Sequence, residues 1–369
     1  MNSKPITLPS EDERHRLLQS PVNGEGLMLL FEAGLTWLMT NQQYVNSLNV
    51  FPVPDGDTGT NMVLTMQAAL NEASQTPSRN VGEMARMFAQ GALMGARGNS
   101  GVILSQIWRG FARALDHYET MDNGLFMRAL QEARNTAYKG VVRPVEGTIL
   151  TVIKDITSAA EVEATQTTKL SELLVAIVEA GDASVKTTPE LLPILKQAGV
   201  VDSGGTGLFF IFEGMLRLIQ GQPLDVTTAK VKPLSELELA NTLETIEEGQ
   251  DYEVVIDFAP KAEFRLEDYY EGLETIGTSI QVGEGEGIYR MHIHTLLDKR
   301  YEPIAYTEAV GTVKKIMMEN LQDQMNQRQA EEEPVKCAPI NAGEIGVVAV
   351  SPGVGLSKIF ASLGAAAIV

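Results

Sequence analysis

The sequence predicts a multi-domain chain with an all-α first domain, a small α+β middle domain and the start of an α/β domain. From Gly26 to about Gln220, apolar residues recur mainly at intervals of three and four, which is typical of helices. After Gln220 the pattern changes, and alternating runs typical of strands occupy Tyr252–Phe258 and Tyr289–Thr295. Helices and strands therefore fall in separate parts of the chain.

In the first domain, breaks rich in glycine, proline, asparagine and aspartate separate segments of roughly ten to twenty residues, which predicts about six to eight packed helices. Composition also predicts the boundaries. We expect an N-terminal tail (1–25), the helical domain (26–222), the α+β domain (235–329), a linker (330–342) and the start of the α/β domain (343–369).

The later domains have their own expected elements. In the middle domain we expect helices at Leu266–Ile276 and Glu308–Gln329 beside the strands. In the last part we expect a strand at Ile345–Val350, a helix at Leu356–Leu363 and a second strand from Ala365. A parallel strand pair joined by a helix is normally covered on both faces, so we expect this third domain to be incomplete.

Charge and composition narrow the function. The chain has 48 acidic and 29 basic residues and a net charge of −19, which repels phosphate backbones and anionic lipids and argues against a nucleic-acid partner. No apolar run is long enough to cross a membrane, and Met1–Ser20 does not resemble a signal peptide. The single cysteine, Cys337, allows no intrachain disulfide. These features predict a cytoplasmic protein without membrane insertion.

The strongest motif is the segment NVFPVPDGDTGTNM at Asn49–Met62. Gly56 separates two carboxylates, Asp55 and Asp57, which can converge on one hard cation such as magnesium. A helix is expected to open directly afterwards, and its first backbone N–H groups can face an anion. The alternative interpretation is an acidic turn with an aspartate helix cap.

A second motif, GARGNSG at Gly95–Gly101, is a glycine-rich loop that runs into a helix. Its small residues let backbone amides close around phosphate oxygens, although a plain loop between bundle helices is the alternative. No Walker-type loop or protein-kinase motif set occurs, which disfavours those enzyme classes. Two further polar loops, Arg143–Thr148 and Val201–Gly207, precede apolar helices, where each could instead be a simple cap and turn. Four such loops predict one shared site at the end of the helical domain.

Residues 26 to 220, with the Asn49–Met62 segment, the Gly95–Gly101 loop and Pro144–Thr148, resemble the nucleotide-binding domain of the dihydroxyacetone kinase family. Within that family, the motifs are similar to those of the fatty acid kinase branch. This resemblance implies an eight-helix antiparallel barrel that holds ATP or ADP through two magnesium ions. It also implies a middle domain and a truncated C-terminal DegV-like domain that engages a DegV-like, fatty-acid-binding carrier protein.

The resemblance also implies roles for individual residues. Asp55 and Asp57 match the family's metal-binding aspartates and are the expected catalytic residues. Asn49 stands near a third metal-binding aspartate of the dihydroxyacetone branch, and its neutral amide is a weaker magnesium ligand. The expected nucleotide contacts are Thr58, Thr60, Asn61, Gly98, Asn99, Ser100, Thr148 and Asp202.

A second metal site is suggested by His292 and His294, which point to the same face of a strand and could both bind zinc. The alternative is a pair of exposed strand residues. The fatty acid kinase branch carries a similar H-x-H sequence in its middle domain. However, Glu253 stands where the resemblance leads us to expect a cysteine.

The resulting hypothesis is transfer of the γ-phosphoryl group of ATP to a fatty acid carboxylate, giving an acyl phosphate on the carrier. A carboxylate is already ionised at neutral pH and needs no general base, which agrees with a proposed site that contains no histidine. The alternatives are the nucleotide-binding subunit of a dihydroxyacetone (glycerone) kinase and a nucleotide-regulated adaptor without phosphoryl transfer. Pairing of two chains through the middle domain is left open.

Overall fold

The computed structural model describes residues 10–226, 251–321, 323, 337, 345–351 and 354–368. The chain divides into two compact units, Met1–Glu319 and Asn320–Val369. The first unit contains the helical domain and most of the sheet domain, which confirms the predicted fold class. The predicted linker (330–342) lies outside the described residues, apart from Cys337.

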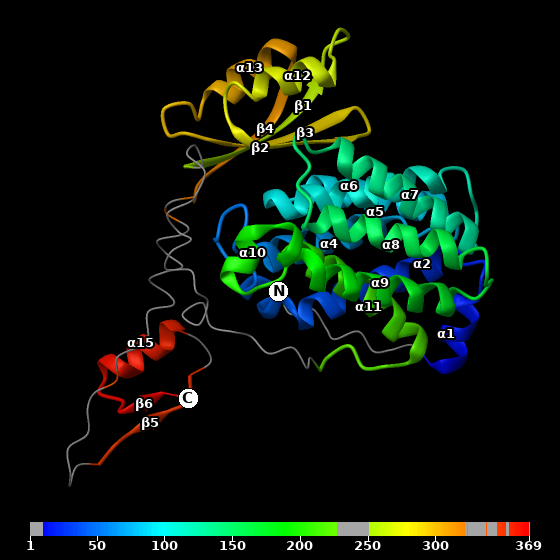
Figure 1. The fold of residues 1–369 in the computed structure, drawn as a ribbon, viewed down its shortest axis with the longest axis horizontal. Helices are drawn as coiled ribbons and strands as arrows, with labels where there is room; N and C mark the ends of the chain where they lie inside the picture. Colours follow the sequence, from blue (N-terminus) through cyan, green and yellow to red (C-terminus); the bar gives the residue numbers. More distant parts are fainter. Residues whose placement is uncertain are drawn as a thin grey trace. The chain divides into compact units, whose positions relative to one another are not determined.

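Eight long helices form the first domain (Figure 1). They are α2 (Gly24–Thr40), α4 (Thr58–Gln75), α5 (Val81–Gly95), α6 (Gly98–Leu115), α7 (Asn123–Lys139), α8 (Ile149–Glu163), α9 (Leu170–Leu191) and α11 (Ser203–Gln220). Three shorter helices, α1 (Glu11–Leu18), α3 (Gln42–Ser47) and α10 (Pro193–Ala198), accompany them. Each long helix contacts the next in sequence and α11 contacts α2, so the eight close into a ring.

Polar residues ahead of the helices fix where several of them begin. Asn23, Asn80 and Asp122 each accept a hydrogen bond from a backbone N–H in the first turn of α2, α5 and α7. These caps satisfy N–H groups that have no partner inside the helix. Inside the ring, Trp108 is 1% exposed and packs edge-on against Phe31 and Phe88.

The middle domain is a four-stranded sheet of order β2-β3-β1-β4 with two helices. Its elements are β1 (Tyr252–Pro260), α12 (Leu266–Leu273), β2 (Thr278–Gly285), β3 (Ile288–Thr295), α13 (Glu302–Val310) and β4 (Gly311–Asn320). β3 pairs antiparallel with both β1 and β2. The apolar face of the sheet carries Val254, Ile256 and Met291, which pack in one core with Tyr269 and Leu273 of α12.

The predicted helix at Glu308–Gln329 is wrong over most of its described length, because α13 ends at Val310 and β4 occupies Gly311–Asn320. The lysines, methionines and glutamate of this segment favour a helix by propensity. Pairing beside β1 overrides that preference, since strand formation depends on non-local neighbours. Residues 322 and 324–329 lie outside the described part.

The second unit contains the predicted strand–helix–strand arrangement. β5 (Val348–Ala349) and β6 (Ala367–Ile368) pair in parallel, and α15 (Val354–Ser362) lies between them in sequence. A parallel pair needs such a crossover connection. The predicted order of elements is therefore confirmed for the described residues of this segment.

The sheet and the helical ring share backbone hydrogen bonds. Val282 N–H donates to the carbonyl of Gly140 at 3.0 Å, and Val142 N–H donates to the carbonyl of Ile280 at 3.4 Å. The segment after α7 therefore covers the outer edge of β2. A Cβ added at Gly283 of β2 would lie 2.3 Å from Nε2 of Gln106 in α6, so glycine permits this close approach.

The closest approach between α6 and α7 yields a stability prediction. A Cβ at Gly110 would lie 2.2 Å from the carbonyl oxygen of Glu132, so Gly110→Ala must push two helix backbones apart. We expect the free energy of unfolding to fall by about 1–3 kcal/mol, measured from the urea midpoint of the helical circular dichroism signal.

The matched control is Gly124→Ala in α7, where an added Cβ meets only a side-chain oxygen of Asp122 at 3.6 Å. This substitution should leave stability unchanged or raise it by up to about 1 kcal/mol, because alanine is the better helix former. Equal urea midpoints for the two variants would contradict the packing described for α6 and α7.

Candidate functional site

A cavity of about 520 Å³ opens where α4, α6, α8 and α11 begin. The segments that follow α7 and α9 line the same cavity, so alternate helices run in opposite directions, as the antiparallel barrel requires. The sequence-predicted residues that line it are Asn49, Asp55, Asp57, Thr58, Asn61, Gly98, Asn99, Ser100, Thr148 and Asp202. The structure therefore brings the four predicted polar loops to one end of the ring.

The loop before α4 holds both predicted catalytic carboxylates, which are half-buried. Asp57 Oδ2 accepts a hydrogen bond from Asn61 Nδ2 at 2.7 Å. Burial and the negative charge of neighbouring Asp57 raise the pKa of Asp55 well above its usual value. A divalent cation between the two carboxylates would offset this repulsion, and magnesium commonly binds through one or two carboxylates together with substrate phosphates.

Asn49 stabilises this loop through its amide. Its Oδ1 accepts hydrogen bonds from the backbone N–H and the hydroxyl of Thr58, at 3.2 and 2.7 Å, and its Nδ2 donates to the carbonyl of Val53 at 2.8 Å. An amide oxygen has two lone pairs, and Thr58 uses both. This geometry favours a scaffolding role for Asn49 over the predicted role as a metal ligand.

The glycine-rich loop lies directly against the aspartate loop. Gly98 has φ +57°, and a Cβ there would lie 2.4 Å from Nδ2 of Asn61, so both backbone conformation and space require glycine. The predicted phosphate contact at Gly98 has a protein partner in this structure, because its backbone N–H donates to the carboxylate of Glu253. The Asn99 side chain likewise turns to the middle domain, where its Oδ1 accepts from Gln281 Nε2 at 2.5 Å.

The remaining two loops place their polar residues as helix caps. Thr148 precedes α8 and donates its hydroxyl to the carbonyl of Val145 at 2.7 Å. Asp202 caps α11 by accepting from the backbone N–H of Gly205 at 2.6 Å. Burial raises the pKa of Asp202 to about 7, although backbone N–H groups of Gly205 and Ile149 oppose this shift. Both capping residues still line the cavity.

Thr60 is the predicted nucleotide contact that the structure does not bring to the cavity. Its hydroxyl accepts hydrogen bonds from Gln42 Nε2 at 2.9 Å and Asn46 Nδ2 at 3.1 Å, so it ties α4 to α3. Position in the motif did not distinguish it from Asn61. The two side chains leave the helix in different directions, and only that of Asn61 reaches the cavity.

The middle domain supplies cavity residues that the sequence did not indicate. Glu253, Gln281 and His294 all line it, so the expectation of a site without histidine is wrong. Burial and the charge of His292 lower the pKa of His294 to about 3, so its ring is neutral at physiological pH. Because these residues come from separate strands, only the antiparallel register brings them together.

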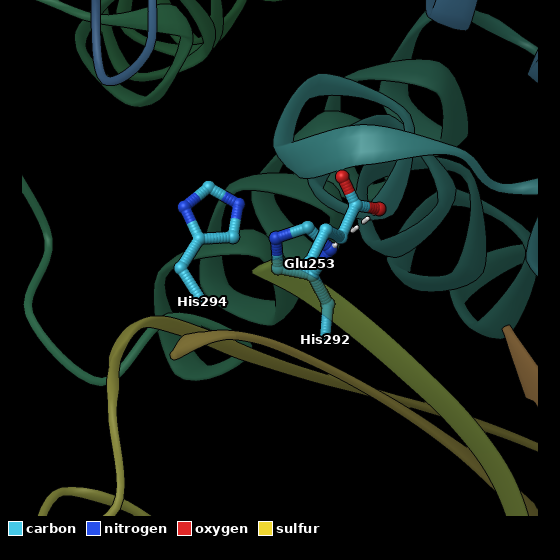
Figure 2. A group of neighbouring side chains, drawn as sticks. All are labelled: Glu253, His292 and His294. Carbon is cyan, nitrogen blue, oxygen red and sulfur yellow. Dashed lines mark ion pairs between the residues drawn. The ribbon is translucent and has the colours of Figure 1, made fainter. Parts of the chain in front are cut away.

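Glu253, His292 and His294 form a compact cluster of metal-compatible side chains (Figure 2). One ligand atom from each lies within 4.8 Å of the others, and His292 Nδ1 lies 3.3 Å from Glu253 Oε1. The histidines are 0% and 2% exposed, so the alternative of exposed strand residues is wrong. His292 Nε2 and His294 Nδ1 have no hydrogen-bond partner among the described residues. Two buried imidazoles and a carboxylate are a suitable donor set for zinc.

Comparisons with known proteins agree with this two-domain arrangement. Residues 52–217 match the family model described as the DAK2 domain, and residues 249–328 match the model of the FakA-like middle domain of fatty acid kinase. No described helix is long and apolar enough to span a membrane.

Relatives of similar sequence occur in staphylococci. An uncharacterized protein of Staphylococcus saprophyticus is 37% identical over 358 residues, which cover 94% of this chain and 64% of the relative. One from Staphylococcus aureus strain USA300 is also 37% identical over 358 residues, covering 95% of this chain and 65% of the relative. The chain thus spans slightly less than two thirds of the length of these relatives.

Among solved structures, the native crystal structure of the dihydroxyacetone kinase of C. freundii is similar to this chain with a TM-score of 0.40 and 18% identity. That similarity covers 59% of this chain and 38% of the kinase chain. The two domain matches, in the order in which they occur here, show that the chain belongs to the dihydroxyacetone kinase family, in its FakA-like fatty acid kinase branch.

Proposed function

We propose that this chain is the ATP-dependent component of a kinase that transfers the γ-phosphoryl group of ATP to a fatty acid carboxylate. The acceptor would be presented by a separate DegV-like carrier protein. The observation that carries the proposal is the position of Asp55 and Asp57, which line one cavity together with the starts of four helices. Helix starts favour anions, and paired carboxylates bind magnesium, so the two features together suit a magnesium–nucleotide complex.

The cavity has both polar and apolar walls. Ile149, Leu150 and Ile194 line it near Thr148 and Asp202, and this apolar surface suits an adenine base. The aspartates and the glycine-rich loop would then face the phosphates. When bound, magnesium would neutralise negative charge that develops on the phosphates during transfer. Asn61 would hold Asp57 in place through their 2.7 Å hydrogen bond.

The proposed reaction needs no proton transfer. A carboxylate oxygen of the fatty acid attacks the γ-phosphorus, and the bond between that phosphorus and the β–γ bridging oxygen breaks. Its electron pair stays with ADP, and the product is an acyl phosphate. This chemistry suits a cavity in which His294, with a pKa of about 3, is a poor general base at neutral pH.

One observation favours the runner-up, the nucleotide-binding component of a dihydroxyacetone kinase. A hydroxyl acceptor must lose a proton, and a general base works best when its pKa lies near the working pH. Asp202 has a pKa of about 7 and lines the cavity. Its Oδ2 is engaged by the N–H of Gly205, however, which favours a capping role.

We further propose that Glu253, His292 and His294 hold a zinc ion. Glu253 keeps a pKa below its usual value, because the two imidazoles and the Gly98 N–H outweigh the opposite effect of burial. An ionised carboxylate and neutral imidazoles are the protonation states that ligate metals. A bound cation would satisfy the imidazole nitrogens that have no partner among the described residues.

Replacing Asp57 with alanine tests the magnesium assignment. We expect phosphoryl transfer from ATP to fall at least about a thousandfold, because metal-assisted charge stabilisation is worth several kcal/mol. The helical circular dichroism signal should persist. Asp116→Asn, which removes the same charge from an exposed position, should leave transfer unchanged. Transfer that survives in Asp57→Ala would show that the metal is bound elsewhere.

The acceptor is tested by supplying radiolabelled ATP with either a lipid-loaded carrier or dihydroxyacetone. We expect label only on the lipid, in a product that hydroxylamine converts to a hydroxamate, as an acyl phosphate requires. Label on dihydroxyacetone would favour the runner-up. Saturable nucleotide binding without transfer to either acceptor would instead indicate a regulatory adaptor.

Zinc binding is tested by metal analysis of the purified protein after exhaustive dialysis. We expect about one zinc per chain, and Glu253→Gln or His292→Ala should weaken binding at least about tenfold. Glu253→Cys should strengthen it, because thiolate is a softer zinc ligand. His117→Ala, at a highly exposed histidine, is the control and should change nothing. Zinc retained equally by all four variants would rule out this cluster.

A further inference from the structure

Arg290 of β3 is the largest buried cation described in the middle domain, with 1% of its surface exposed. It forms a bidentate pair with Asp257, its cross-strand neighbour on β1, through contacts of 2.6 and 2.7 Å. Its remaining nitrogen, Nη1, donates to the carbonyls of Leu93 at 2.7 Å and Ala96 at 3.1 Å. One guanidinium thus joins the sheet to the helical domain.

The two carbonyls lie at the C-terminal end of α5. This end carries partial negative charge, and its last carbonyls have no partner inside the helix, so a buried cation is well suited to it. α5 ends at Gly95, and α6 begins at Gly98. Arg290 therefore holds the chain immediately before the glycine-rich loop.

Two more contacts from the middle domain reach the same loop. The backbone N–H of Gly98 donates to the Glu253 carboxylate, and the Asn99 side chain accepts from Gln281 Nε2. In addition, a Cβ at Gly283 would lie 2.9 Å from Leu93 Cδ1, so β2 packs closely on the end of α5. Three strands of one sheet thus contact the segment from Leu93 to Asn99.

We propose that Arg290 is a positioning residue for the phosphate-binding loop, so that the middle domain forms part of the nucleotide site. This inference rests on the proposed function, because it assigns the loop to the phosphates of ATP. A buried ion pair adds little net stability compared with apolar residues of the same size. Its planar fork does fix geometry, and here it fixes the distance between the sheet and the end of α5.

The primary test is Arg290→Lys, which keeps the charge but cannot pair with both Asp257 oxygens and both carbonyls at once. Asp257→Asn is the second variant, since it keeps Arg290 and removes only its charged anchor on β1. The matched control is Glu286→Gln, which removes the exposed ion pair between Arg86 of α5 and the turn after β2. That pair also joins the two domains but does not contact the loop.

The first measurement is hydrogen exchange of the peptide covering residues 96–101 in nucleotide-free protein. We expect faster exchange in Arg290→Lys and Asp257→Asn, and no change in Glu286→Gln. The second is the affinity for ATP, ADP and adenosine. Both positioning variants should bind ATP and ADP about tenfold more weakly, because hydrogen bonds to phosphate are lost. Their adenosine affinity should stay within about twofold.

The outcomes separate this inference from the proposed function. Unchanged loop exchange in both variants would overturn the positioning role. An equal loss of affinity for adenosine and ATP would also overturn it, since that pattern reflects general destabilisation. If the unmodified protein binds neither ATP nor ADP, the proposed function fails, while the exchange measurement still decides whether Arg290 positions the loop.

Discussion

Negative charge concentrated at one end of the helical ring is the constraint on which the site depends. Asp55 and Asp57 lie together in a loop, and the repulsion between them raises the pKa of Asp55. The whole chain adds to this field with a net charge of −19. Such an arrangement is favourable for a polyphosphate only if a divalent cation lies between the anions. The starts of α4, α6, α8 and α11 add the positive ends of four helix dipoles.

The loops around the cavity are held by one another. Asn49 fixes the start of α4, Asn61 connects Asp57 to the space beside Gly98, and the hydroxyl of Ser203 donates to that of Thr58 at 3.2 Å. The two aspartates are therefore placed by polar side chains from neighbouring loops. Sites built in this way keep their geometry before ligand arrives, which lowers the entropy lost on binding.

Local sequence was sufficient to predict the features that depend on local chemistry. Helix starts after Asp57, Arg97, Thr148 and Asp202 follow from capping residues and glycine, and their convergence follows from an antiparallel bundle. The alternation of Arg290, His292 and His294 on one strand face also follows from a period of two.

Features that depend on distant partners could not be predicted. β4 is a strand because it lies beside β1, despite residues that favour a helix. Glu253 is a cavity residue because the register sets it opposite His294. Thr60 turns toward α3 because Gln42 and Asn46 bind its hydroxyl. In each case the deciding contact comes from another element, and no pattern within the segment reports it.

The middle sheet shows why its polar face belongs with the helical domain. Buried polar groups are unfavourable unless they are paired, and most on this face find partners. Arg290 pairs with Asp257 and two carbonyls, and Gln281 donates to Asn99. Among the described residues, the atoms that still lack a partner include Gln281 Oε1, His292 Nε2 and His294 Nδ1. Each can offer a lone pair, and a cation is the simplest single species that would satisfy lone pairs converging beside Glu253.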